Sequence, residues 1–213
     1  MGMISYIKEE LNVIKERDPA IKTGMEVLLY SSFKAILSYR VAHKLFLNKH
    51  YFLARWVSQR AARKTGIEIH PGAKIGRGLF IDHGSGVVIG ETTEIGDNCT
   101  LYQGVTLGGT GKHTGKRHPT LGNNVMVGSG AKVLGPMKIG DNSKIAANAV
   151  VLSEIPDNST AVGIPARVVR RNNQKVVECD LDQVHIPDPV AQELCKLNLR
   201  IEALEKASRE NNQ

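Results

Sequence analysis

The sequence predicts a mainly β protein, a parallel β-helix wound from six-residue repeats, with an α-helical domain before it and a helix after it. Three observations carry this prediction. A bulky aliphatic residue returns at every sixth position from about residue 67 to residue 165, apart from two interruptions. The residue two places before each of these aliphatics is small or apolar, and the residues after it are mostly Gly, Asn or Asp. We therefore divide the chain into residues 1–65, 66–169 and 170–213.

The six-residue period is the main signal for the central domain. Its aliphatic row consists of Ile69, Ile75, Ile81, Ile89, Ile95, Leu101, Leu107, Leu121, Val127, Val133, Ile139, Ile145 and Val151. A period of six matches neither the turn of an α-helix nor the alternation of a sheet strand that ends in a hairpin. In a hexapeptide β-helix each short strand ends at a turn, and about 18 residues complete one triangular coil. Stacked coils bury the row as one core, and Gly and Asn suit the corners because they tolerate a positive φ.

The N-terminal domain shows apolar side chains at helical spacing. We expect helices over residues 3–16, 25–47 and 51–64, which pack together and close the bottom of the prism. The Asp18-Pro19 pair separates the first helix from the second, because the residue before a proline avoids helical backbone angles.

Beyond residue 169 the six-residue period fades into a polar stretch and an extended segment. A last helix is expected after Pro189, with apolar residues at heptad-like spacing. These residues are Leu194, Leu197, Ile201 and Leu204. So short a row needs packing against the prism, or against copies of itself in an oligomer.

Composition and charge limit the function classes. The chain has 213 residues and a formal net charge of +7, which suits nucleic acid or an anionic small molecule as a partner. We find no basic stripe with interleaved aromatic residues, so nucleic acid is not expected. Cys99, Cys179 and Cys195 are odd in number and widely spaced, which favours a reducing compartment. Because the sequence shows neither a signal-peptide pattern nor an apolar run approaching about 18 residues, we expect a cytoplasmic protein with no membrane partner.

Polar chemistry is concentrated where the period is interrupted, as expected for the loops of a repeat protein. The first interruption, residues 82–86, carries His83. Histidine moves protons near neutral pH, and a histidine that acts as a general base is oriented by a carboxylate on its other ring nitrogen. Counting hexads, Glu68 begins the face to which the His83 corner returns one coil later, so Glu68 can reach His83. We expect these two residues to be catalytic.

The second interruption is a glycine-rich arm over residues 108–119, which carries Arg117 and His118. It leaves the prism at a different corner from His83, so one chain cannot easily bring His118 to His83. A neighbouring chain in a side-by-side trimer can do so. We therefore expect a site that is shared between subunits.

The segment IEIHPGAKIGRGLFIDHGSGVVIGETTEIGDN, followed by QGVTLGGTGKHTGKRHP and later by VGIPARVV, resembles the serine O-acetyltransferases, a family of hexapeptide-repeat acyltransferases. The resemblance runs from about Asp18 to Arg167. It implies a left-handed parallel β-helix and transfer of acetyl from acetyl-coenzyme A to the hydroxyl of L-serine, in cysteine biosynthesis. Acetyl-coenzyme A is then a co-substrate, and no metal is expected.

The resemblance also implies roles for the matching positions. His83 would be the general base, and Glu68 stands where many members have Asp as its partner. Serine is a zwitterion, so a site that binds it needs anions for the ammonium group and cations for the carboxylate. Its ammonium group would be held by Asp18 and Asp82, and its carboxylate by Arg117 and His118. Coenzyme A would lie in the groove between neighbouring prisms, against Gly109, Ser129, Lys144 and Ala147.

Partners follow from the same resemblance. We expect a homotrimer or a dimer of trimers, and the chain lacks the family's earliest helices, which leaves this choice open. Cysteine is an expected feedback inhibitor because it carries the same zwitterion as serine. The chain ends in Asn211-Asn212-Gln213, and not in the isoleucine that inserts into O-acetylserine sulfhydrylase, so we do not expect that enzyme as a partner.

Three alternatives stay open. A related hexapeptide acetyltransferase acting on a sugar or antibiotic hydroxyl would share the prism and His83, but it has no need of an amino-acid clamp. A zinc carbonic anhydrase on the same prism needs three histidines around one metal ion. His83 and His118, with His70 or His113, would have to supply them. A purely structural solenoid would not explain polar residues concentrated at two interruptions.

Overall fold

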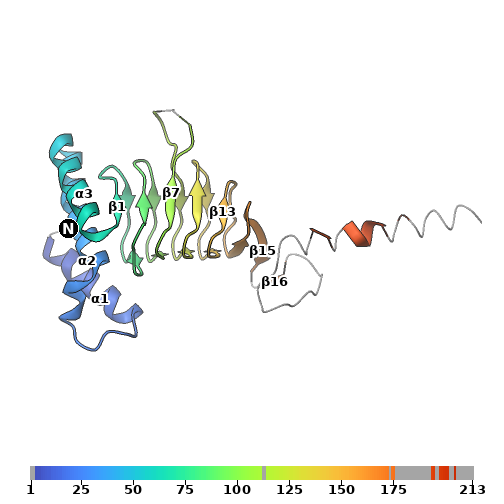
Figure 1. Cartoon of the computed structure of the whole chain (residues 1–213), viewed down its shortest axis with the longest axis horizontal. Helices are drawn as coiled ribbons and strands as arrows, with labels where there is room; N and C mark the ends of the chain where they lie inside the picture. Colours follow the sequence, from blue (N-terminus) through green and yellow to red (C-terminus); the bar gives the residue numbers. More distant parts are fainter. Residues whose placement is uncertain are drawn as a thin grey trace, which may run out of the picture.

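The computed structural model describes residues 3–111, 114–172, 174–175, 193–194, 197–201 and 204. Helices gather at one end of the molecule, and a stack of short strands continues from them as a prism (Figure 1). A long loop stands out from the side of the prism near its middle (Figure 1).

The prism has three faces, each a sheet of stacked strands. Sheet A consists of β1 (Glu68–Ile69), β4 (Val88–Ile89), β7 (Thr106–Gly108), β10 (Lys132–Leu134) and β13 (Val150–Val151). Sheet B consists of β2 (Lys74–Ile75), β5 (Glu94–Ile95), β8 (Thr120–Leu121) and β11 (Lys138–Ile139). Sheet C consists of β3 (Phe80–Ile81), β6 (Thr100–Leu101), β9 (Met126–Val127), β12 (Lys144–Ile145), β14 (Ser159–Val162), β15 (Arg167–Arg171) and β16 (Gln174–Lys175). The chain passes from A to B to C in each coil, and the parallel pairing of successive coils confirms the predicted β-helix.

The aliphatic row predicted from the period forms the core. Each of its members is at most 8% exposed. Successive coils are in register, so Ile69 lies beside Ile89 and Ile89 beside Leu107. Because each buried aliphatic side chain contributes about 1.5–3 kcal/mol relative to an exposed one, this stacking is a major source of stability.

The corner between sheets B and C repeats an asparagine in successive coils. Asn98, Asn124, Asn142 and Asn158 have φ angles of 55–57°, in the left-handed region that asparagine tolerates. The side chain of Asn124 donates to that of Asn142, and Asn142 donates to Asn158, each at 3.1 Å. The turn residues therefore form a hydrogen-bonded ladder along this edge of the prism.

The N-terminal domain consists of α1 (Met3–Arg17), the 3-10 helix η1 (Glu26–Leu29), α2 (Ser31–Leu47) and α3 (Tyr51–Thr65). Helices α1 and α3 confirm the helices predicted over residues 3–16 and 51–64. The single helix predicted over residues 25–47 is wrong, because Tyr30 adopts an extended conformation (φ −61°, ψ 131°) between η1 and α2. Its hydroxyl donates to Asp18 Oδ2 at 2.5 Å, and the serines that follow it favour helix starts over helix interiors.

Side chains of α2 and α3 close the open end of the prism. The first coil has strand-edge carbonyls that no preceding coil can satisfy, and such edges need partners. The hydroxyls of Tyr39 and Ser58 donate to two of these carbonyls at 2.6 and 2.7 Å. Arg40 donates to two more, at 2.7 and 2.6 Å. The helical domain is therefore hydrogen-bonded to the coil stack as well as packed on it.

At the other end, β14 pairs with β15 and β15 with β16, both antiparallel. β15 runs across the predicted boundary between residues 169 and 170. Of the predicted last helix, the residues that the structure describes are helical. Its apolar row is 50–70% exposed, at Leu194, Leu197, Ile201 and Leu204. None of the described helices is long and apolar enough to span a membrane.

One carboxyl group of α1 is buried within the helical domain. Glu10 is 1% exposed, and its Oε2 atom has no hydrogen-bond partner among the described residues. The guanidinium of Arg40 lies over the rings of Tyr6 and Tyr39, with its carbon 4.8 and 5.4 Å from their centroids. Burial raises the pKa of Glu10 to about 7, which Arg40 partly offsets and Glu9 reinforces.

We expect Glu10→Gln to flatten the dependence of stability on pH. The folded pKa lies above the unfolded value near 4.5, so the stability linked to this group is fully present below pH 4.5 and is lost as the pH rises through about 7. The variant avoids this loss because the amide does not ionise. Between about pH 5 and about pH 8, the free energy of unfolding of the variant should rise relative to that of the parent chain. This relative rise should be at most on the order of 3 kcal/mol.

Chemical denaturation at the two pH values measures this difference. Glu16→Gln, at an exposed position of the same helix, is the matched control and should keep the pH dependence of the parent chain. Parallel stability curves for Glu10→Gln and the parent chain would contradict the prediction.

Candidate active site

The first interruption forms a tight corner between β3 and β4. His83, Gly84 and Gly86 have φ angles of 57°, 76° and 75°. A Cβ at Gly84 would lie 2.4 Å from Cδ1 of Ile67, so the corner packs directly on the core. The His83 side chain is 77% exposed, and its Nε2 lies 3.8 Å from Asp82 Oδ1. The corner thus holds an imidazole and a carboxylate at the surface on a tightly packed turn.

The end of α1 contributes Asp18. The preceding residue, Arg17, donates to the Thr100 hydroxyl at 3.1 Å and so anchors the end of the helix on the prism. Asp18 Oδ2 accepts a hydrogen bond from the Tyr30 hydroxyl at 2.5 Å, and Oδ1 accepts one from the backbone N–H of Ala20 at 2.8 Å. These contacts fix both oxygens of the carboxylate.

Electrostatic interactions link Asp18 to the His83 corner. The Tyr30 hydrogen bond, followed by that of Ala20, lowers the pKa of Asp18, and His83 adds a smaller lowering. In turn the hydrogen bond to Asp18 raises the pKa of Tyr30 to about 12, with a smaller contribution from Asp82. Asp18 is therefore within electrostatic reach of the His83 corner of the same chain.

Glu68 lies at the start of β1 and faces α3. Its Oε1 accepts a hydrogen bond from Gln59 at 3.4 Å and lies 3.9 Å from an Arg55 nitrogen. Among the residues that the structure describes, no hydrogen bond or ion pair joins Glu68 to His83. The predicted pair is thus not formed in this arrangement of side chains, because α3 offers the carboxylate nearer partners.

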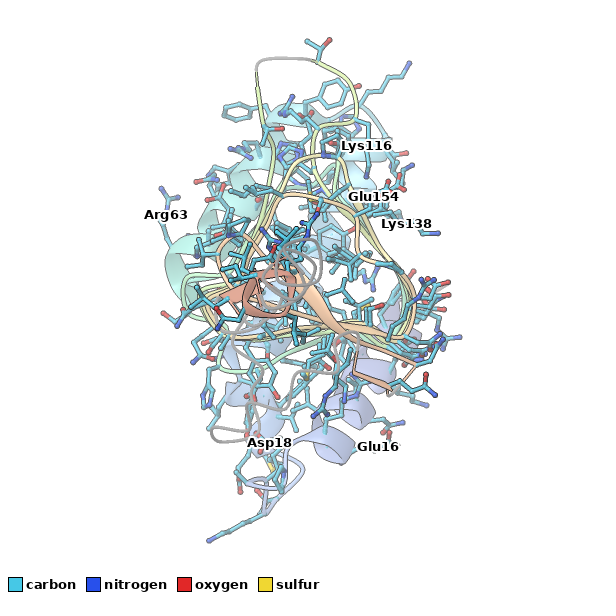
Figure 2. All side chains as sticks on the ribbon, turned by 90° about the vertical axis from the view of Figure 1, so that its right-hand side faces the viewer. Glu16, Asp18, Arg63, Lys116, Lys138 and Glu154 are labelled. Atoms are coloured by element: carbon cyan, nitrogen blue, oxygen red, sulfur yellow. The ribbon has the colours of Figure 1, made fainter. Side chains whose placement is uncertain are left out.

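The second interruption leaves the prism between β7 and β8, at the corner between sheets A and B. The His83 corner lies between sheets C and A, so the two interruptions are at different corners, as predicted. Figure 2 views the molecule at right angles to Figure 1 and shows Lys116 of the arm and Asp18 on opposite sides. Lys112 and His113 lie outside the described residues.

The arm returns to the prism through Arg117 and His118. Arg117 Nη2 forms an ion pair with Glu91 Oε2 at 2.6 Å. His118 is 8% exposed, and its Nδ1 lies 3.2 Å from the backbone nitrogen of Thr92 and 2.9 Å from Thr92 Oγ1. Burial lowers the pKa of His118, and the charge of Arg117 lowers it further. The two predicted carboxylate-binding residues therefore lie beside Glu91 and Thr92.

Sequence reasoning missed Glu91 and Thr92. They lie between β4 and β5, at the corner between sheets A and B one coil before the arm. Counting hexads could have found them, because every coil returns to the same corner. They keep the six-residue period, however, so no interruption drew attention to them.

The residues predicted to contact coenzyme A divide between the two corners and sheet C. Ser129 and Ala147 belong to the corner between sheets C and A, in later coils than His83. Lys144 is an exposed residue of β12 on sheet C. Gly109 lies at the base of the arm, at the other corner.

A cavity of about 310 Å³ lies beside the arm. It is lined by Phe46, Gly72, Lys74, Glu91, Thr92, Thr93, Glu94 and Lys116. Its lining includes Lys116 of the arm and Glu91 and Thr92 beside the arm, but none of residues 82–86 at the His83 corner. Within the described part of the chain, no group of three His, Cys, Asp or Glu residues is placed to hold a metal ion.

Comparisons with known proteins agree with this architecture. Residues 118–153 match the family described as bacterial transferase hexapeptide (six repeats). A serine acetyltransferase of Bacillus subtilis (strain 168) is 54% identical over 196 residues, which cover 92% of this chain and 90% of the relative.

Solved structures are similar as well. The crystal structure of Neisseria gonorrhoeae serine acetyltransferase in complex with serine has a TM-score of 0.75 and 41% identity, covering 79% of this chain and 69% of that one. The serine acetyltransferase of Brucella abortus strain S19 in complex with coenzyme A has a TM-score of 0.76 and 41% identity, covering 79% and 68%.

These similarities confirm the predicted fold class, a left-handed parallel β-helix of hexapeptide repeats with helices at its N-terminal end. The sequence identity extends over nearly the whole of this chain and of its bacterial relative. The chain therefore belongs to the serine acetyltransferase family, acyltransferases built on hexapeptide repeats.

Proposed function

We propose that this enzyme transfers acetyl from acetyl-coenzyme A directly to the hydroxyl of L-serine, with His83 as the general base. As His83 takes the hydroxyl proton, the serine oxygen attacks the thioester carbonyl. The carbon–sulfur bond then breaks, and the coenzyme thiolate leaves and takes up a proton. An acyl-enzyme is not required, because holding the two substrates together supplies much of the rate.

The exposed imidazole of His83 supports this role, since histidine is well suited to proton transfer near neutral pH. We keep Glu68 in the proposal as its partner. The contacts that hold Glu68 against α3 are long, at 3.4 and 3.9 Å, and its side chain is 42% exposed. Turning it toward His83 would therefore break only weak interactions.

The serine zwitterion would be held between two clusters of opposite charge. Asp18 and Asp82 would bind the ammonium group, and the lowered pKa of Asp18 keeps its carboxylate ionised. Arg117 and His118 would bind the carboxylate, with the planar guanidinium as the charged partner. In this arrangement the serine carboxylate competes with Glu91 for Arg117.

The observation that carries the proposal is the separation of these two clusters in a single chain. Asp18 and the arm lie on opposite sides of the molecule (Figure 2). We therefore propose a homotrimer in which the arm of one subunit closes over the His83 corner of the next. A dimer of such trimers would keep the same site.

Acetyl-coenzyme A would occupy the groove between neighbouring prisms. Ser129 and Ala147 supply one wall, on the same corner as His83, and Lys144 offers a cation on sheet C. Gly109 supplies the opposite wall from the arm of the neighbouring subunit. This placement would bring the thioester between the general base and the bound serine.

The product places the enzyme in cysteine biosynthesis, and cysteine is the proposed feedback inhibitor because its zwitterion matches that of serine. Cys99 is a buried free thiol, which fits a reducing compartment such as the cytoplasm. The deciding experiment follows coenzyme thiol release from acetyl-coenzyme A with L-serine, with and without cysteine. Thiol release with a sugar or antibiotic hydroxyl in place of serine would instead support the rival acetyltransferase.

We expect His83→Ala to lower kcat by roughly 10²–10⁴-fold, because the serine hydroxyl loses its proton acceptor. Binding of serine and coenzyme A should survive, since the clamp is intact, and equilibrium binding measures this. His50→Ala, at an exposed position before α3, is the matched control. Near-normal turnover in a folded His83→Ala protein would remove His83 from the mechanism.

We expect Arg117→Ala to raise KM for serine while leaving KM for acetyl-coenzyme A nearly unchanged, because only the amino acid loses its cationic partner. Arg117→Lys should recover part of the loss, since lysine keeps the charge but not the two-pronged geometry. Arg63→Ala removes an equal charge from an exposed position of α3 and serves as the control. A change confined to the coenzyme constant would show that the arm contacts the coenzyme instead.

A further inference from the structure

We propose that Thr92 is a positioning residue that holds His118 in one tautomer, with its proton on Nε2, for donation to the substrate. The inference deepens the proposed function, because it concerns the carboxylate-binding half of the same site. No interruption of the six-residue pattern points to Thr92. Its role follows from the hydrogen bonds that meet at its side chain.

The Thr92 hydroxyl is the point at which the arm is fastened to the prism. Its Oγ1 accepts hydrogen bonds from the backbone N–H groups of Arg117 at 3.0 Å and His118 at 3.1 Å. The Thr92 carbonyl accepts a further bond from Lys116 Nζ at 2.7 Å. Three consecutive residues of the returning arm are therefore bound to a single residue of the corner below.

This arrangement determines where the hydroxyl proton goes. A hydroxyl oxygen has two acceptor sites and one proton. Both acceptor sites of Thr92 Oγ1 are used by the arm's backbone, so its proton remains to be donated to His118 Nδ1, at 2.9 Å. The backbone N–H of Thr92 points at the same Nδ1 at 3.2 Å and can only donate.

His118 Nδ1 is consequently an acceptor of two hydrogen bonds and carries no proton. In a neutral imidazole the proton must then be on Nε2, which becomes a donor. A protonated ring would place an N–H against two donors, so the same contacts oppose the imidazolium form. Thr92 thus selects both the tautomer and the neutral state.

Two glycine residues pack closely against the Nε2 side of the ring. A Cβ at Gly90 would lie 2.1 Å from this atom, and one at Gly109 would lie 3.1 Å from it. Glycine at both positions therefore gives the imidazole ring the space that a Cβ atom would otherwise occupy. Among the described residues, no hydrogen-bond acceptor is paired with Nε2.

Burial and the neighbouring cations also favour the neutral ring, and Glu91 opposes them. Burial lowers the pKa of His118, and Arg117 and Lys116 lower it further, while Glu91 raises it. His70, at the same corner two coils earlier, also interacts electrostatically with the ring. The serine carboxylate would then receive a charged contact from Arg117 and an uncharged hydrogen bond from the Nε2–H group of His118.

The test compares Thr92→Val, which removes only the hydroxyl at nearly constant size, with Thr92→Ser, which keeps it. Nitrogen-15 NMR of the full-length, ligand-free protein labelled at histidine reports the tautomer and pKa of His118, assigned with His118→Gln. We expect the parent chain and Thr92→Ser to show the Nε2–H form. Thr92→Val keeps the backbone donor but loses the hydroxyl, so it should populate the other tautomer in part and titrate at a higher pH.

Kinetics provide the second readout. We expect Thr92→Val to raise KM for serine about 5- to 10-fold with a smaller effect on kcat, and Thr92→Ser to restore it. Thr93→Val is the matched control, because the Thr93 hydroxyl is buried without a hydrogen-bond partner in the described structure. It should leave both the tautomer and the serine constant unchanged, since no hydrogen bond is lost.

The outcomes separate this inference from the proposed function. An unchanged tautomer and pKa in folded Thr92→Val, or equal impairment of Thr92→Val and Thr92→Ser, would overturn it. If the parent chain failed to acetylate serine, the NMR comparison alone would still decide whether Thr92 sets the tautomer. Serine acetylation by a Thr92→Val protein with unchanged constants would overturn the inference and leave the proposed function standing.

Discussion

The six-residue register of the coil stack is the constraint on which the rest of the structure depends. Each strand must return its aliphatic side chain to the inward row, since the row is the core of the prism. A coil that gained residues within a strand would turn that side chain outward and expose apolar surface. Extra residues are therefore tolerated only at corners, where they leave the prism as loops. Both interruptions lie at such corners, and His83, Arg117 and His118 of the proposed site belong to them.

Much of the molecule could be predicted from this register. The period located the strands, the buried row and the two interruptions, because each of these is a local pattern in the sequence. The position of Asp18 near His83 was implied by resemblance alone, since it depends on how α1 docks, and the Arg17 anchor that fixes it is a long-range contact. Long-range contacts of this kind leave no periodic trace.

The features that the register does not predict have the same physical origin. The break at Tyr30 follows from a hydrogen bond to Asp18, twelve positions earlier, which helical spacing cannot reveal. Glu68 has the register to approach His83, but α3 supplies competing partners that hexad counting does not include. Thr92 keeps the period and is chemically ordinary, and only the coordinates show three arm residues bonded to it. Side-chain competition, rather than backbone architecture, limits what the sequence reveals.

The closed ends of the prism have a consequence for assembly. A stack of identical coils has no inherent length, and each end is a template onto which another strand edge could add, as in a cross-β fibre. Here the hydroxyls and guanidinium of α2 and α3 occupy one edge, and at the other end β15 and β16 extend sheet C with antiparallel pairing. At the helical end, another strand edge could therefore not add to these carbonyls without displacing α2 and α3.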